Sequence, residues 1–196
     1  MDAKYLLQLR CVTTASSRSR EREQGALMIV CETARLNLRQ LQLDDAPFVL
    51  ELVNEPAWLR FIGDRGVRTL KDARRYLKDG PLASYERHGF GLYAMELRAD
   101  AIPIGMCGLL KRETLEHVDI GFALLERHWG HGYAHESADA VMELAKDRFA
   151  LQRVVAITTT DNRSSASLLE KIGMHFVRMI RMPNDDEELR LFARDF

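Results

Sequence analysis

Apolar positions in the first half of the chain predict a strand followed by helices. Around residues 35–41 apolar and polar side chains alternate, which is typical of a strand. Asp44 or Asp45 then offers an N-cap for a helix, and Thr69 is a second N-cap because apolar residues follow it at helical spacing. The Gly80-Pro81 pair predicts a break in this second helix before a last turn.

The middle of the chain changes to a two-residue period. Three β-like runs follow one another, separated by turn-prone and charged segments: Phe90–Leu97, Ile104–Leu110 and Val118–Leu125. A helix over Ala134–Phe149 and a β-branched strand over Val154–Thr159 then complete a β-α-β unit.

The C-terminal part predicts a short helix and a closing hairpin. Ser164 or Ser165 is the expected cap of the helix, which ends at Gly173, and the hairpin strands are His175–Met182 and Leu189–Phe192. The whole pattern predicts an α/β (α+β) fold with a mixed central sheet, an antiparallel N-terminal meander and flanking helices.

Length and composition favour a single domain. A chain of 196 residues that is 46% hydrophobic can bury one core. Residues 1–27 contain a polar stretch without periodicity, so we expect a flexible tail there and a domain over 28–196.

Charge and cysteine content restrict the partners. Lys and Arg total 28 against 29 Asp and Glu, so no broad field attracts nucleic acid or a membrane surface. No apolar run reaches the roughly 20 residues that span a bilayer. Three scattered cysteines suggest reduced thiols. We therefore expect a cytoplasmic monomer or homodimer that binds neither nucleic acid nor membrane.

The segment Arg127–Ala134 carries the most specific chemical signal. It lies between a predicted strand and a predicted helix, and it contains Gly130 and Gly132. Glycines there allow consecutive backbone N–H groups to point at one phosphate group, with the helix dipole behind them. A glycine-rich turn without a ligand is the simpler alternative. Neither the Gly-Lys-Ser/Thr of a P-loop nor the third glycine of a dinucleotide site is present.

This segment resembles the signature of the GNAT acetyltransferase superfamily. Its pattern Gln/Arg-x-x-Gly-x-Gly/Ala is met by Arg127, Gly130 and Gly132. Residues 161–174 are similar to the second landmark of that family, an Asn-x-x-Ser turn and a Leu-x-Glu-Lys-x-Gly-Phe-like helix end, with Met174 as a mild departure. Three earlier segments are similar to the RimJ/RimL ribosomal-protein N-terminal acetyltransferase branch: Arg35-Leu36-Asn37-Leu38-Arg39, Asn54-Glu55-Pro56 and Ile104-Gly105-Met106-Cys107-Gly108.

The resemblance implies acetyl-CoA as cosubstrate, without a metal. In this family two strands splay beside the loop, here residues 122–125 and 155–159, and the pantetheine arm lies between them. Backbone groups near Leu124 and Leu125 would bind the arm, with Asn162 on the other side and Ser165 nearby. The resemblance also nominates neighbours of the diphosphate: Arg127, His128, Gly130, His131, Gly132, Tyr133 and Ala134.

The implied reaction is acetyl transfer to a primary amine, a protein N-terminal α-amine or a small-molecule amine, by direct attack in a ternary complex. Asp119 is the candidate base because its strand resembles the one that carries a catalytic carboxylate in many relatives. The alternative is an aspartate exposed at a strand edge, with Glu116 or His117 as weaker bases. Many relatives have a tyrosine at the position of Leu169, where it acts as the general acid that protonates the departing thiolate. Because Leu169 cannot do this, Ser165 or water is the candidate general acid.

Other functions stay open on the sequence alone. The missing tyrosine fits a catalytically silent acyl-CoA-binding regulatory module, and the glycine loop fits a nucleotide-binding protein. His128, His131 and His135 form a conceivable metal cluster, but the two loop glycines oppose their convergence.

Overall fold

The computed structural model describes residues 27–183 and 186–196, so the expected flexible tail lies almost wholly outside the described residues. Eight strands form one sheet in the order β1-β2-β3-β4-β5-β6-β8-β7. Every neighbouring pair is antiparallel except β5 with β6. The strands are β1 Ile29–Glu32, β2 Leu36–Gln40, β3 Leu92–Leu97, β4 Pro103–Leu110, β5 Val118–Leu124, β6 Arg153–Thr159, β7 His175–Arg181 and β8 Glu188–Asp195.

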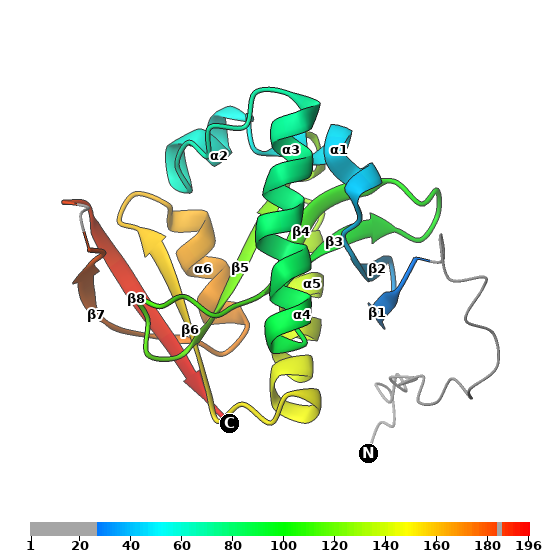
Figure 1. Cartoon of the computed structure of the whole chain (residues 1–196). Coiled ribbons are helices and arrows are strands. Elements are labelled where there is room, and N and C mark those ends of the chain that lie inside the picture. The colour runs from blue at the N-terminus through cyan, green and yellow to red at the C-terminus, as the bar shows by residue number, and fades with distance from the viewer. Residues whose placement is uncertain (1–26, 184–185) are drawn as a thin grey trace, which may run out of the picture.

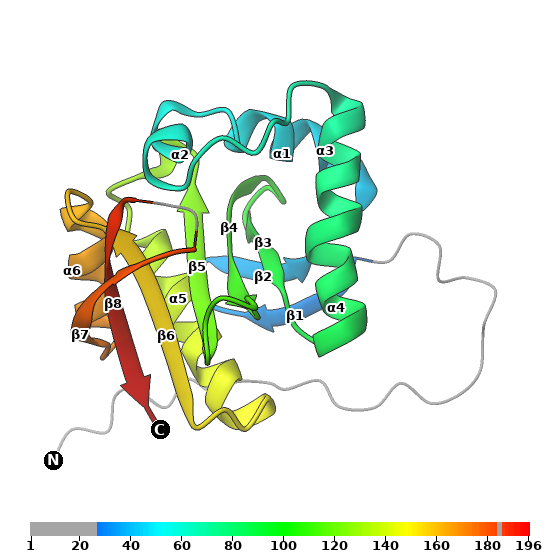
Figure 2. The same cartoon turned by 60° about the vertical axis from the view of Figure 1, so that its left-hand side comes forward.

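Helices cover both faces of this sheet (Figures 1 and 2). Helices α1, α2 and α3 lie on one face, and α5 and α6 lie on the other. The helices are α1 Ala46–Leu52, α2 Pro56–Phe61, α3 Leu70–Leu77, α4 Ala83–His88, α5 Tyr133–Glu143 and α6 Arg163–Lys171. The predicted mixed sheet with an antiparallel meander and flanking helices is therefore confirmed. No helix among the described residues has the length and apolar character that a bilayer crossing requires.

The predicted break at Gly80-Pro81 is only a local widening of the helix. Residues Lys78–Leu82 form a π-helical turn that contains Pro81 and joins α3 to α4. The two helices follow one another along one line in Figure 1. A wider turn relieves the clash between a proline ring and the preceding turn, so helical backbone continues past the proline.

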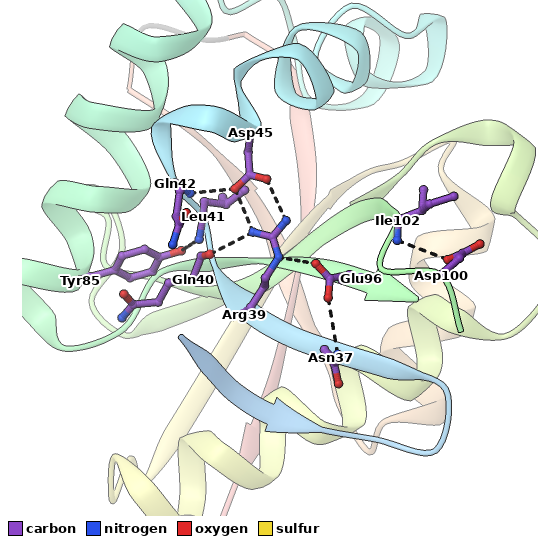
Figure 3. A network of polar contacts seen from close by, with 10 residues as sticks. All are labelled: Asn37, Arg39, Gln40, Leu41, Gln42, Asp45, Tyr85, Glu96, Asp100 and Ile102. Carbon is purple, nitrogen blue, oxygen red and sulfur yellow. Dashed lines mark hydrogen bonds and ion pairs between the residues drawn. The ribbon is translucent and has the colours of Figure 1, made fainter. Parts of the chain in front are cut away.

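The first helix begins at the predicted place, but Asp45 does not cap it with its side chain. The carboxylate of Asp45 accepts two hydrogen bonds from Arg39 at 2.8 and 2.9 Å and one from the backbone of Gln42 at 2.7 Å. Arg39 also donates to Glu96 at 2.6 Å, and its side chain is only 5% exposed (Figure 3). A buried ion-pair network thus joins β2, β3 and the start of α1.

The predicted cap of the last helix shifts by two to three residues. Asn162, rather than Ser164 or Ser165, is the N-cap of α6, and its side chain accepts a hydrogen bond from the backbone N–H of Ser165. Gly173, with φ of +80°, ends the helix as predicted. β1 has no counterpart in the prediction, because residues 26–31 are an unbroken apolar run without the two-residue alternation of a half-buried strand.

Candidate cofactor and acceptor site

Strands β5 and β6 lie side by side only at their beginnings. Their parallel pairing consists of Val118 with Val154 and Asp119 with Val155. Beyond these residues β5 stays paired with β4, and β6 stays paired with β8, so the two strands diverge (Figure 2). The predicted splay is confirmed, and it begins immediately after Asp119.

Main-chain groups of β5 face the resulting gap at every second residue. The N–H of Leu125 donates to the carbonyl of Ile104 at 3.0 Å, so Leu125 is bonded toward β4 and does not fit the predicted contact with a pantetheine arm. Because antiparallel pairs alternate between bonded and non-bonded partners, the groups of Leu124 and Phe122 face β6 instead. The carbonyl of Leu124 accepts the indole N–H of Trp129 at 3.0 Å. The N–H of Leu124 and the main chain of Phe122 remain directed at the gap.

The loop between β5 and α5 depends on two glycines with left-handed backbone conformation. Gly130 has φ of +77° and Gly132 has φ of +82°, values that L side chains rarely adopt. A β-carbon on Gly130 would meet nothing within 4 Å, and on Gly132 its nearest neighbour would be a guanidinium nitrogen of Arg35 at 3.4 Å. The outer side of both glycines is therefore open to a ligand.

Six consecutive N–H groups, from Gly130 to His135, have no hydrogen-bond partner within residues 27–183 and 186–196. The first bond of α5 runs from the N–H of Glu136 to the carbonyl of Gly132 at 3.1 Å. The open groups therefore stand at the positive end of the α5 dipole. A ligand with several anionic oxygens, such as a diphosphate, would satisfy them.

Arg35 and Glu136 attach this end of α5 to the turn between β1 and β2. The carboxylate of Glu136 accepts from the backbone N–H of Arg35 at 2.8 Å, from its Nε at 2.7 Å and from the hydroxyl of Thr33 at 2.6 Å. Arg35 Nη1 also donates to the carbonyl of His131 at 2.9 Å, and the guanidinium lies 4.6 Å from the ring centroid of Tyr133. Burial raises the pKa of Glu136, but these hydrogen bonds outweigh it and lower the pKa. No sequence pattern predicts this contact, because it joins residues 101 positions apart.

The side chain of Arg127 is engaged by helix α1. Its guanidinium pairs with the carboxylate of Glu51, and the neighbouring backbone N–H of Glu126 donates to Glu55 at 2.8 Å. These contacts fix the start of the loop against the N-terminal helices. His128 is half-buried, and burial together with neighbouring Arg127 lowers its pKa. A role for these two residues at a diphosphate stays a prediction.

The β6 and α6 side of the gap contains one buried polar side chain without a partner among the described residues. Thr158, on β6 beyond the last contact with β5, has a buried hydroxyl that makes no hydrogen bond in the described part of the chain. Asn162 uses its carbonyl oxygen to cap α6, with Ser165 half-buried in the first turn of that helix. Leu169, one turn later, is buried in the core. The orphaned Thr158 hydroxyl fits an amide-bearing ligand in the gap.

Asp119 is buried at the apex of the splay. It is only 1% exposed, so the alternative of a solvent-exposed strand-edge aspartate is wrong. Nε of Arg112 lies 3.2 and 3.1 Å from its two carboxylate oxygens. Burial raises the pKa of Asp119 to about 6, and the positive charge of Arg112 limits the rise. A carboxyl with this pKa is mostly ionised at neutral pH and can accept a proton.

A cavity of about 390 Å³ adjoins this ion pair on the face of the sheet that carries α3. Arg112 and Leu110 both line it, and Leu110 is the direct β4 partner of Asp119. The other lining residues are Arg65, Tyr76, Thr114 and Met182. No motif in the sequence indicates this cavity, because its lining comes from four separate parts of the chain.

No group of three or more His, Cys, Asp and Glu side chains is arranged to hold a metal ion among the residues that the structure describes. The ring of His131 instead stacks on that of Tyr133, with centroids 5.7 Å apart. The histidine metal cluster considered from the sequence therefore has no geometric support.

The family follows from comparison with known sequences. A family model described as an acetyltransferase (GNAT) domain matches residues 35–175, well over half of the chain. The chain belongs to the GNAT acetyltransferase family. As a GNAT protein it is an acyltransferase, and the predicted family and fold are confirmed.

Curated relatives of this GNAT protein come from Bacillus. It is 27% identical over 155 residues to the uncharacterized protein YkkB of Bacillus subtilis. The aligned region covers 78% of this chain and 88% of YkkB. It is 25% identical over 154 residues to the uncharacterized N-acetyltransferase YoaA of the same organism, covering 78% and 86%.

Solved structures share the fold at lower identity. An acetyltransferase from Agrobacterium tumefaciens has a TM-score of 0.72 and 24% identity, covering 92% of this chain and 100% of that one. RimL, a ribosomal L7/L12 alpha-N-protein acetyltransferase in complex with coenzyme A, has a TM-score of 0.72 and 20% identity, covering 87% and 98%.

Proposed function

We propose that this GNAT protein transfers the acetyl group of acetyl-CoA to a primary amine by direct attack in a ternary complex. The observation that carries the proposal is the run of open N–H groups from Gly130 to His135, beside the gap between β5 and β6. The thioester would supply an activated acetyl group. The chain's own groups would bind the carrier, orient the amine and receive its proton.

The roles divide between the two sides of the gap. The N–H groups of residues 130–135 hold the diphosphate, and the main chain of Phe122 and Leu124 holds the arm and stabilises charge on the thioester oxygen. Thr158 and Asn162 bind the arm from β6 and α6. Burial raises the pKa of Cys107 to about 12, which opposes a thiolate nucleophile and supports direct transfer.

Asp119 acts as the base, and its burial suggests that a water molecule relays the proton. Its pKa of about 6 suits an α-amine, which titrates near 7.7 to 8.0, better than a lysine near 10.4. A protein N-terminus or a small molecule with a similar amine is therefore the favoured acceptor. The fold shared with RimL makes N-terminal peptides the first acceptors to examine. Ser165 or water serves as the acid, since Leu169 is buried.

Calorimetry with CoA and a thiol-release assay with acetyl-CoA and a panel of amines test the proposal. We expect CoA binding and turnover of at least one α-amine. Absence of CoA binding would remove the function. Binding without turnover of any amine would instead support the catalytically silent module, and competition of ATP with CoA would support a nucleotide-binding protein.

A further inference from the structure

Positive charge gathers around the cavity next to Asp119. Its charged lining residues are Arg65 and Arg112, both cationic. An adjoining cavity of about 240 Å³ shares Arg112 and adds Lys111 and Arg87, against the single carboxylate of Asp79. The whole chain has a formal charge of only -1. The cationic lining is therefore a local feature rather than a consequence of overall composition.

The guanidinium of Arg112 has one edge occupied and one edge open. Its Nε binds both oxygens of Asp119, at 3.2 and 3.1 Å. No group within the described ranges accepts a hydrogen bond from Nη1 or Nη2, and the side chain is 34% exposed. Because a guanidinium has five N–H donors in a fixed plane, the open edge can hold a second carboxylate while Nε keeps Asp119.

The loop before α3 supplies the second cation. Asp64 and Arg68 pair with each other, and Arg68 also donates to Asn54 at 3.0 Å. Arg65 lies between these partners in sequence, is exposed, and makes no ion pair with any described residue. Because the carboxylate of Asp64 is already paired with Arg68, Arg65 stays available to bind a ligand.

Tyr76 connects the two arginines. Its ring, on α3, lines both cavities, and the charges of Arg65 and Arg112 both act on its phenol group. The phenol donates to no described residue. Two guanidinium groups and one phenol around a single cavity form a donor set that matches a carboxylate.

Resting on the proposed function, we infer that the acceptor carries a carboxylate close to its reactive amine, and that Arg65, Tyr76 and the open edge of Arg112 bind this carboxylate. Arg112 then holds the acceptor beside the base that it already positions. Acceptors with a second cation, such as polyamines, meet like charge in the same cavity and are disfavoured. The carboxylate belongs either to an acidic residue after a peptide N-terminus or to a free amino acid.

Matched acceptors test this inference. The amidated peptides Ser-Asp-Ala, Ser-Asn-Ala and Ser-Lys-Ala present the same terminal residue and differ in one side-chain charge. Free glutamate and its amide-blocked diamide form a second arm, which distinguishes an amino acid from a peptide. We expect kcat/KM for the carboxylate-bearing member of at least one arm to exceed its neutral counterpart about tenfold, the size of one charge-assisted hydrogen bond. The lysine peptide should be the poorest.

Two variants locate the effect. Arg65→Gln should reduce the preference, taken as the ratio of kcat/KM for the acidic peptide to kcat/KM for the neutral peptide, to about twofold or less. Arg74→Gln is the matched control, because Arg74 is exposed on α3 and does not line either cavity. Equal kcat/KM for acidic and neutral acceptors, or an unchanged preference in Arg65→Gln, would overturn the inference.

Calorimetric titration of the peptides into the CoA-saturated protein separates the two proposals. Selective binding of the aspartate peptide without turnover would support the carboxylate site and contradict the proposed transfer reaction. Turnover without discrimination among the peptides and amino acids would support the transfer reaction and contradict the carboxylate site. If the protein shows no selective binding and no turnover, both proposals are wrong.

Discussion

Burial of Asp119 makes a quantitative prediction about stability. The pKa of this carboxyl is about 6 in the folded protein, whereas an unfolded chain has about 3.9. The protonated form is thus favoured by folding, and this stabilisation is present below about pH 3.9 and is lost as the pH rises through about 6. At neutral pH the ionised carboxylate costs about 3 kcal/mol relative to its protonated form.

Asp119→Asn removes this cost because the amide does not ionise. We expect the free energy of unfolding of the variant, minus that of wild type, to increase by about 2 kcal/mol as the pH rises from about 4.5 to about 7.5. Arg112 loses its partner but is 34% exposed, so water can solvate it. The change with pH, rather than the absolute difference, isolates the titration from the effect of the new amide.

Urea denaturation of both proteins at four pH values over this range measures the effect. Asp139→Asn is the control, since Asp139 is exposed on α5 and makes no ion pair with a described residue. A difference between Asp119→Asn and wild type that stays flat with pH, or an equal slope in the control, would refute the argument from burial. The same variant should lose most turnover at neutral pH if Asp119 is the base.

Three further substitutions and one control examine the loop and the core. Gly132→Ala should weaken CoA binding at least tenfold by calorimetry, whereas Gly89→Ala, which meets a similar φ of +75° at the end of α4, should cost stability only. Arg35→Gln should weaken CoA binding about threefold to tenfold by the same assay, because the N-terminus of α5 loses its attachment; unchanged affinity would contradict this. Arg39→Met should cost about 3 to 5 kcal/mol in urea denaturation, since it leaves Glu96 charged and buried, and a cost below about 1 kcal/mol would contradict this.

Local patterns predicted most of the elements, since each depends on nearby residues. The three β-like runs were predicted within two residues of their observed limits. The helix predicted over Ala134–Phe149 begins at Tyr133, but α5 ends at Glu143 and a π-helical turn over Leu144–Arg148 continues it. Asn162 was missed as a cap because serines also fit that role. The pairing of Arg112 with Asp119, and the place of Tyr76 beside Arg112 in one cavity, depend on how β4, β5 and α3 pack together. No spacing in the sequence expresses that packing.

The attachment of α5 to the first hairpin bears on where the chain can be shortened. The family match begins at residue 35, but two structural features lie before it. Thr33 donates to Glu136, and β1 pairs with β2. A deletion that starts translation at Met28 keeps β1 and Thr33 and should therefore retain this brace. A deletion to residue 35 removes an edge strand and one of the three donors, and we expect it to lower both the melting temperature and the affinity for CoA. Expression boundaries for this enzyme are therefore better drawn from the hairpin than from the extent of family similarity.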